Sequence, residues 1–200
     1  LMSLTRVEIN EHVPPRHRVD LAEVLSVVRE TLAVRAEQRQ MTLVLDHPAD
    51  LPPVIGETDQ LIQVFHNLVE NAVKYARAGT EVKITASPIE RLPGTQTPGV
   101  RVSIADHGDG IPTIHLPRLT ERFYRADKGR SRRLGGTGLG LAIVKHILNR
   151  HRGRLSIESV VGEGSTFTVF LPAPPLQALD ARAQGNGESS PDLPHDVIKT

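Results

Sequence analysis

Apolar side chains recur every three to four residues in three long segments of this 200-residue chain, and they alternate with polar side chains in several shorter segments. The first spacing is that of a helix with one buried face, and the second is that of a half-buried strand. The predicted helices cover residues 19–40, 59–76 and 139–152. The predicted strands cover residues 41–45, 81–87, 100–105, 154–160 and 165–171. This mixture predicts a single α/β domain.

Turns and chain ends are indicated by other residue types. Thr58 and Asp59 have the right chemistry to cap the start of the second helix, and the proline pair at 52–53 predicts a turn before it. Residues 108–140 are rich in glycine and basic residues and show little periodicity. We expect a helix stub and linker at 1–16, the folded domain at 17–172, and a disordered tail rich in Pro, Ala, Asp, Gly and Ser at 173–200.

The composition narrows the range of partners. The chain has 24 basic and 23 acidic residues, so it offers no overall field that would favour nucleic acid or a membrane surface. It has no cysteine, which excludes disulfides and thiolate metal sites and fits a cytoplasmic location. No apolar run approaches the ~18 residues needed to cross a bilayer. Because the first residue is Leu1 rather than methionine, we expect a fragment, with any membrane anchor upstream.

Three polar residues share one face of the second predicted helix. Asn67, Asn71 and Lys74 stand at positions i, i+4 and i+7. Asparagine is a poor helix former, so two of them one turn apart suggest a polar partner. An amide oxygen suits Mg²⁺, which needs only one or two protein ligands beside nucleotide phosphates, and a lysine would add a charge for those phosphates. The alternative is an ordinary solvated helix face.

A carboxylate and two glycines directly follow the strand predicted at 100–105. Asp106 stands where the chain leaves the sheet, with Gly108 and Gly110 where the backbone must turn. A carboxylate at this point can accept a hydrogen bond from the amine of adenine, whereas guanine would present an acceptor. The alternative is a simple turn.

A second glycine string opens the third predicted helix. The segment from Gly135 to Gly140 exposes backbone N–H groups at a helix start, where they can meet phosphate oxygens. It is not a P-loop, because no Lys-Ser or Lys-Thr pair follows. A flexible hinge is the alternative. The later Gly162-Glu163-Gly164 segment is typical of a hairpin turn.

A basic run, residues 121–133, lies between these two glycine segments and begins with Glu-Arg-Phe-Tyr-Arg. A mobile lid over a polyphosphate, covering about 111–137, would explain both its charge and the glycines on either side. A merely solvated loop is the alternative. Nucleic-acid binding is disfavoured because aromatic and basic residues do not alternate.

Taken together and in order, these segments resemble the five sequence boxes of the histidine-kinase catalytic domain, a member of the gyrase, Hsp90, histidine kinase and MutL ATPase superfamily. The matching strings are HNLVENAVKYA, DHGDG, ERFYRAD, GGTGLGLAIVKHI and GEGSTFTVFLP. The resemblance covers about residues 19–172. It implies a two-layer α/β sandwich, the Bergerat fold, with helices packed on one face of a mixed sheet.

The resemblance also implies roles for individual residues. Asn71 would bind Mg²⁺, Asn67 would support the phosphates or the metal, and Lys74 and Arg125 would contact phosphates. Tyr75 would contact the sugar or adenine, and Asp106 the adenine amine. The further residues implied in ATP binding are Gly108, Gly110, Ile111, Phe123, Gly136, Thr137, Gly138, Leu139, Gly140, Leu141 and Thr166.

Two departures from the superfamily pattern refine this hypothesis. The ATPases of the superfamily carry a water-activating Glu four residues before the metal-binding Asn, and here that position is Asn67. Slow hydrolysis and transfer of the γ-phosphoryl group are therefore expected. None of the nine histidines has the His-Glu or His-Asp setting of a phosphate acceptor; His12, His66 and His107 illustrate this. The acceptor histidine is therefore expected on a dimerisation hairpin upstream of this chain.

The sequence thus predicts the catalytic domain of a two-component sensor histidine kinase, with ATP and Mg²⁺ as cofactors. Its expected partners are the dimerisation hairpin and a response regulator, and the whole protein is expected to be a homodimer anchored in the inner membrane. The lid and the helix after it resemble phosphate-regulon sensor kinases in particular. The alternatives are an ATP-hydrolysing clamp, a nucleotide-gated interaction module and a Ser/Thr kinase of the anti-sigma type.

Overall fold

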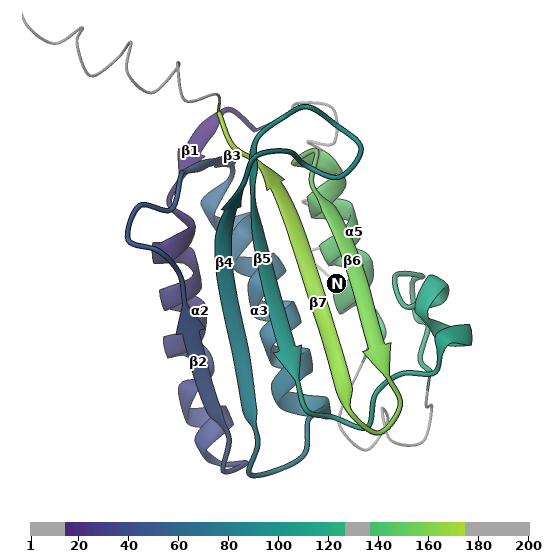
Figure 1. The fold of residues 1–200 in the computed structure, drawn as a ribbon. Helices are drawn as coiled ribbons and strands as arrows, with labels where there is room; N and C mark the ends of the chain where they lie inside the picture. The colour runs from purple at the N-terminus through teal and green to yellow at the C-terminus, as the bar shows by residue number, and fades with distance from the viewer. Residues whose placement is uncertain (1–14, 127–136, 175–200) are drawn as a thin grey trace, which may run out of the picture.

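The computed structural model describes residues 15–126 and 137–174, and within these it forms two layers. Figure 1 views the mixed sheet from its open face, with α2 (Leu21–Glu37), α3 (Thr58–Tyr75) and α5 (Gly140–Arg150) behind it. The predicted fold class, a sheet covered by helices on one face, is confirmed. None of the described helices is long and apolar enough to cross a bilayer.

The main sheet has five strands in the order β2-β4-β5-β7-β6. Its first pair is parallel and the other three pairs are antiparallel. The strands are β2 (Thr42–Asp46), β4 (Glu81–Ile89), β5 (Gly99–Asp106), β6 (Arg154–Val160) and β7 (Gly164–Pro172). All five predicted strands therefore exist, with ends that differ by up to two residues.

Alternation along the central strands separates a buried face from an open one. The inward side chains include Val82, Ile84, Val102, Ile104, Phe167 and Val169, each at most 4% exposed. The intervening positions face away from the helices and are mostly polar; across them Ser103 and Thr168 are joined by a hydroxyl–hydroxyl hydrogen bond of 3.1 Å. Because this alternation fills the helix-covered face of the strands with apolar core, the polar residues of a site between sheet and helices have to lie at the strand ends.

The apolar stripe predicted on α3 is confirmed, but its predicted cap is wrong. Leu61, Phe65, Leu68, Val69, Ala72 and Val73 are all buried at 1% exposure or less. The residue before the helix is Glu57, and no side chain caps it; Thr58 already lies within the helix. The Glu57 N–H instead donates to Nε2 of His151, 3.1 Å away, so a distant histidine supplies the missing partner.

A small second sheet and a 3₁₀ helix lie where no regular element was predicted. β1 (His17–Val19) pairs antiparallel with β3 (Val54–Gly56), and Asp20 then caps α2 by accepting a 2.8 Å hydrogen bond from the Ala22 N–H. These strands are too short for a periodic pattern to predict them. The helix η1 (Thr113–Arg118) stands in the glycine-rich region and lies beside the β6 edge in Figure 1.

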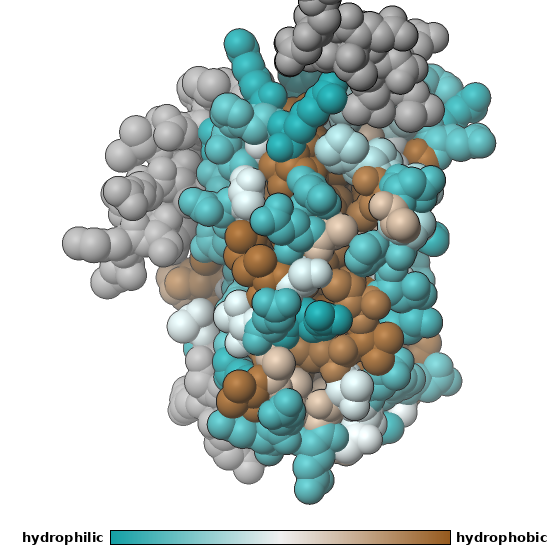
Figure 2. Space-filling model, turned by 90° about the vertical axis from the view of Figure 1, so that its left-hand side faces the viewer, coloured by the Kyte–Doolittle hydropathy of each residue, from teal (hydrophilic) through white to brown (hydrophobic). Residues whose placement is uncertain are grey.

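Some predicted boundaries change and others lie outside the described residues. Ala173 is 6% exposed, and its N–H donates to the Pro98 carbonyl at 3.0 Å, so it extends the β5–β7 pair and does not belong to a tail. The predictions for 1–14, 127–136 and 175–200, which include Gly136, fall outside the described residues. Figure 2 shows the side that carries α2 and β2, where apolar patches lie among polar surface. In α2, Val27 is 40% exposed and Val34 is 64% exposed.

The turn after α5 holds a residue other than glycine in a left-handed conformation. Arg152 has φ of +53°, and the Gly153 N–H donates to the Leu148 carbonyl at 2.8 Å, the bond that closes a Schellman motif. Arg152→Gly is therefore expected to raise the free energy of unfolding by about 0.5–1 kcal/mol, measured by urea titration. Arg154→Gly, on the open sheet face, is the control and should destabilise. A destabilised Arg152→Gly protein would contradict this account.

His151 fastens the end of α5 to the start of α3. It is 2% exposed, and its Nδ1 donates to the Ile147 carbonyl at 2.8 Å while Nε2 accepts from Glu57. Burial lowers the pKa of His151 below its usual value. Both ring nitrogens are used by the neutral form, so protonation would break the bond from Glu57.

A pH dependence of stability follows from this histidine. Above about pH 6.5 the folded and unfolded states are both neutral at His151; below it only the unfolded state gains the proton. The free energy of unfolding should therefore fall with pH below about 6.5, by up to about 1.4 kcal/mol per pH unit from this residue. His151→Gln should flatten this slope in urea titrations between pH 7.5 and 5.5, whereas His17→Gln, at an exposed position, should leave it unchanged. The same slope in both variants would refute the assignment.

Candidate functional site

The helix face predicted to bind a ligand is half-buried and packs against the start of α5. The Asn67 side-chain amide donates to the Gln63 carbonyl at 2.8 Å. Its oxygen would lie 2.9 Å from a Cβ at Gly140. A side chain at Gly140 would therefore press on Asn67, and glycine allows α3 and the N-terminus of α5 to approach. Asn71 and Lys74 lie further along α3 and are also half-buried.

Asp106 ends β5 in a nearly closed environment, 8% exposed. One carboxylate oxygen accepts from the Gly108 N–H at 2.8 Å. Burial raises the pKa of Asp106, and hydrogen bonds from the backbone of Gly108 and Ser165 oppose this rise. The carboxylate is thus held in place by backbone donors, and its remaining lone pairs can accept one further donor.

Gly108 joins this carboxylate to the end of α3. A Cβ on Gly108 would lie 2.7 Å from Oδ1 of Asp106 and 2.9 Å from the Tyr75 carbonyl oxygen. The residue also forms an isolated antiparallel bridge with Ala76. The structure therefore brings together Asp106, Gly108 and Tyr75 from two predicted motifs, and only glycine fits between them.

The loop after Asp106 is fastened to the β6–β7 hairpin. Gly110 has φ of +69°, and a Cβ there would lie 2.1 Å from the Val160 carbonyl oxygen. The Ile111 N–H donates to the Ser159 hydroxyl at 2.8 Å. Arg77 adds a second connection: its Nη2 donates to the Gly162 carbonyl at 2.8 Å, and its Nε lies 3.4 Å from the Asp109 carboxylate. The predicted hairpin turn at 162–164 thus supports the site loop.

Ser165 was missed by the sequence analysis, which predicted Thr166 instead. Thr166 follows the pattern of the open sheet face, opposite Ala105 and Glu158, so the structure does not bring it to the other predicted residues. Ser165 is 7% exposed on the helix-covered side and hydrogen-bonds Ser159 through their hydroxyls at 2.9 Å. The alternation of β7, in which Phe167 and Val169 are buried, could have identified Ser165 as the inward residue.

Arg39 was also missed, because it lies in the turn after α2. Its guanidinium donates to the main-chain carbonyls of Val73, Lys74 and Ala76. These carbonyls lie at the C-terminal end of α3, where partial negative charge accumulates. Arg39 therefore fixes the end of the helix that carries Lys74 and Tyr75.

The remaining predicted residues stand before and after residues 127–136, which lie outside the described part of the chain. The Phe123 N–H donates to the Gly138 carbonyl at 2.8 Å, while the Phe123 ring is 70% exposed. Arg125 is half-buried and Thr137 exposed. Ile111 and Leu141 pack against the hydrophobic core, and Leu139 directly precedes α5. The two sides of the predicted lid thus meet at Phe123 and Gly138.

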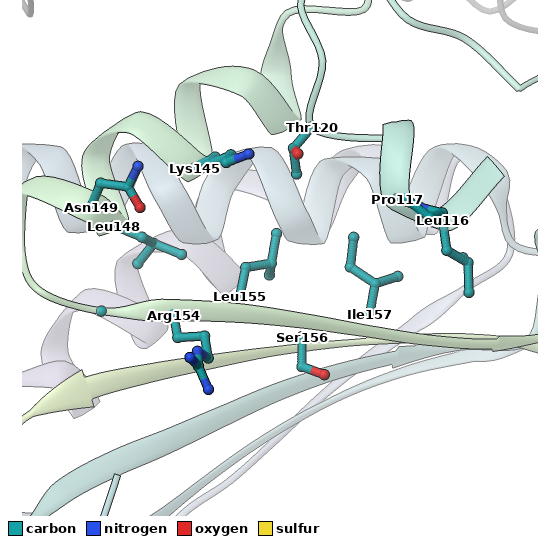
Figure 3. A pocket seen from close by; sticks show the side chains of 11 residues that line it. Leu116, Pro117, Thr120, Lys145, Leu148, Asn149, Arg154, Leu155, Ser156 and Ile157 are labelled. Carbon is teal, nitrogen blue, oxygen red and sulfur yellow. The ribbon is translucent and has the colours of Figure 1, made fainter. Parts of the chain in front are cut away.

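A separate groove of about 660 Å³ lies between η1, α5 and β6, and it contains none of the predicted site residues. Figure 3 shows Leu116 and Pro117 on one side of it and Lys145, Leu148 and Asn149 on another. Leu155 and Ile157 of β6 also line it. The candidate site is therefore identified by the polar side chains at the end of β5 and on α3, and not by this groove.

The convergent groups suit a nucleotide. A buried carboxylate fits the exocyclic amine of a purine, and two amides with one ammonium fit phosphates and a hard cation. No group of three or more His, Cys, Asp or Glu side chains in the described residues could enclose a metal ion by itself. An ion at Asn71 would therefore share its coordination with phosphate oxygens and water, as Mg²⁺ commonly does.

Fold and site together define a nucleotide-binding α/β domain, and the comparison with known families agrees. The profile described as "Histidine kinase-, DNA gyrase B-, and HSP90-like ATPase" matches residues 56–175. This chain belongs to that family. The resemblance derived from the five boxes is confirmed.

Individual relatives narrow the comparison. The chain is 41% identical over 179 residues to the phosphate regulon sensor protein PhoR of Pseudomonas aeruginosa, covering 89% of this chain and 39% of that protein. It is 37% identical over 175 residues to the sensor-like histidine kinase SenX3 of Mycolicibacterium smegmatis, covering 88% and 44%. The chain thus spans about two fifths of the length of these curated relatives.

Solved structures show the same fold. Full-length ShkA in complex with AMPPNP superposes with a TM-score of 0.70 at 30% identity, covering 87% of this chain and 35% of ShkA. The mycobacterial sensor histidine kinase MprB gives a TM-score of 0.63 at 26% identity, covering 80% of this chain and 99% of the MprB chain.

Proposed function

We propose that this chain is the ATP-binding catalytic domain of a sensor histidine kinase, which holds Mg-ATP and transfers the γ-phosphoryl group to a histidine on a separate dimerisation domain. The observation that carries the proposal is that Asp106 and Gly108 lie against the C-terminal end of α3, the helix that carries Asn67, Asn71 and Lys74. The match to the ATPase family and the similarity to AMPPNP-bound ShkA support the choice of nucleotide.

Each group has a separate task in this proposal. Asp106 accepts the adenine amine, and Tyr75 contacts the adenine or sugar. Asn71 holds Mg²⁺ and Asn67 supports the phosphates, with Lys74 placing its ammonium beside them. The N-terminus of α5, opened by Gly138 and Gly140, presents backbone N–H groups to the phosphates. The bound metal neutralises phosphate charge.

An amide in place of a carboxylate at position 67 of α3 favours transfer over hydrolysis. In the superfamily ATPases a glutamate activates water, and Asn67 stands at that position in this chain. The helix carries two carboxylates, Asp59 in its first turn and Glu70, and Glu70 forms an ion pair with Arg35. Neither carboxylate lies at the helix position where the superfamily ATPases carry the water-activating glutamate, because Asn67 occupies it. The γ-phosphoryl group is therefore preserved for an acceptor, and catalysis rests on positioning and charge.

The whole protein of which this chain is part would act in a two-component pathway. We infer that the acceptor histidine lies on a helical hairpin upstream, that the phosphoryl group passes to a response regulator, and that the whole protein is a homodimer. An inner-membrane anchor upstream of a cytoplasmic kinase domain fits the same scheme. The similarity to PhoR suggests, as a finer proposal, that phosphate availability is the signal.

Phosphotransfer to a supplied hairpin tests the proposal. The purified chain is incubated with radiolabelled Mg-ATP and the histidine-bearing hairpin of a related sensor kinase. Acid-labile label on the hairpin is expected. Rapid ADP release without the hairpin would indicate a hydrolysing clamp, and acid-stable label a Ser/Thr kinase. Nucleotide binding without any transfer would indicate a gated interaction module.

A further inference from the structure

Two side chains of the helix η1 contact one tyrosine, Tyr124. None of the six residues of η1 is buried, so the hydrophobic core does not hold it. The Tyr124 hydroxyl forms a 2.6 Å hydrogen bond with Nδ1 of His115. The Arg118 guanidinium lies 4.3 Å from the centroid of the Tyr124 ring. Residues of η1 therefore contact both the hydroxyl and the ring of Tyr124.

Arg118 is itself held in place. Its Nε and Nη2 donate to the Glu121 carboxylate at 3.2–3.3 Å. Glu121 and Tyr124 are also joined through the backbone, since the Tyr124 N–H donates to the Glu121 carbonyl at 3.3 Å. His115, Arg118, Glu121 and Tyr124 thus form a connected group, called the Tyr124 cluster below.

The residue before Tyr124 has an unusual backbone conformation. Phe123 has φ of +66°, a conformation that side chains of its size rarely adopt. Its N–H donates to Gly138, and a Cβ on Gly138 would lie 2.9 Å from the Phe123 Cα. This backbone needs support from surrounding contacts. The Phe123 ring is exposed and supplies little packing, so this support has to come from the hydrogen bond to Gly138 and from the side-chain contacts of neighbouring residues such as Tyr124.

We propose that Tyr124 is a positioning residue: through its hydrogen bond to His115 and its contact with Arg118 it fixes segment 123–125, and so the point from which Arg125 reaches the terminal phosphate. Tyr124 itself contacts η1, which carries none of the proposed nucleotide-binding residues. Tyr124 therefore acts on the nucleotide through its neighbour Arg125. The inference rests on the proposed function, and on the phosphate contact that the family resemblance implies for Arg125. It assigns to η1 a role that the sequence pattern did not indicate.

Calorimetric titrations with ADP and with AMPPNP, both with Mg²⁺, test this role. Tyr124→Phe removes the hydroxyl and keeps the ring, and His115→Phe removes the same bond from the other side. Each variant should bind AMPPNP about 5- to 30-fold more weakly while ADP affinity stays within about twofold. The double variant should lose no more than either single one, because both remove one bond. His17→Phe, on β1, is the control and should bind both nucleotides like the parent chain.

Amide hydrogen exchange at Phe123 gives a second readout that needs no nucleotide. Its N–H should exchange at least about fivefold faster in Tyr124→Phe, because the bond to Gly138 opens more often. Unchanged exchange overturns the inference, as does faster exchange with an unchanged preference for AMPPNP, or an equal loss of both nucleotides. If the parent chain binds neither nucleotide, the proposed function fails, and exchange at Phe123 alone decides whether Tyr124 holds the segment.

Discussion

Asp106→Asn is expected to weaken ADP binding about 100-fold, the largest effect on nucleotide affinity of any single substitution considered for this chain. Both carboxylate oxygens of Asp106 face donors: the backbone N–H groups of Gly108 and Ser165, and the adenine amine in the proposed complex. The amide of asparagine would turn its NH₂ group toward one of these donors. Two buried donors would then face each other without an acceptor. Such a defect costs about 3 kcal/mol, which corresponds to about two orders of magnitude in Kd.

Calorimetry with ADP measures this loss, and two controls make it interpretable. Asp50→Asn makes the same chemical change at an exposed turn position and should leave Kd within about twofold. Thermal unfolding should show Asp106→Asn still folded. The adenine contact also predicts that the parent chain prefers ADP to GDP by at least about 100-fold. Equal affinity of the Asp106→Asn and Asp50→Asn proteins would show that Asp106 does not contact the base.

Arg125→Ala is expected to slow phosphotransfer about 100-fold or more at saturating Mg-ATP while leaving ADP affinity within about twofold. In the proposed complex this guanidinium meets charge on the transferred phosphoryl group, which ADP lacks. An arginine that stabilises such charge contributes 10³ or more in other phosphoryl-transfer enzymes, so about 100-fold is a conservative expectation.

Single-turnover transfer to the supplied hairpin, together with ADP titration, separates the two roles. Arg101→Ala removes an exposed arginine from the open face of the sheet and should change neither value. An equal fall in ADP affinity for Asp106→Asn and Arg125→Ala would contradict the division of tasks between base and phosphate. Normal transfer by Arg125→Ala would leave Lys74 and Mg²⁺ as the groups that neutralise the developing charge.

The separation of adenine recognition from phosphate chemistry has a structural basis. Asp106 lies at the end of a central strand and is held by backbone donors, so it is rigid before a nucleotide binds. Arg125 lies on a segment held by polar contacts of η1 rather than by the core. A rigid pocket for the base, beside a less firmly held segment that contacts the phosphates, suits a site in which the nucleotide binds first and the segment closes over it afterwards.

Local pattern was sufficient where a residue's surroundings follow from its own element. The stripe on α3 was predicted because helical periodicity places Leu61, Phe65 and Leu68 on one side. The same periodicity placed Asn67, Asn71 and Lys74 together on another. Asp106 was found because a carboxylate at the end of a predicted strand has to lie at the rim of the sheet.

Prediction failed where the partner is distant in sequence. Glu57 has no side-chain cap because His151, more than ninety residues later, accepts from its backbone. Thr166 was named from the box resemblance, which marks a segment; the alternation of β7 places Ser165, not Thr166, on the helix-covered side. The pair β1 and β3 was missed because three residues are too few to show a period.

The sequence by itself determined the class of fold, the main helices and strands, and the polar groups available for a nucleotide, since each depends on spacing within one element. Only the tertiary structure decided that Arg39 holds the end of α3, that Arg77 ties the Asp106 loop to the β6–β7 hairpin, and that Tyr124 anchors η1. These contacts join segments whose meeting depends on strand order and helix packing. Those are fixed by burial of the whole core, which no single stretch of sequence contains.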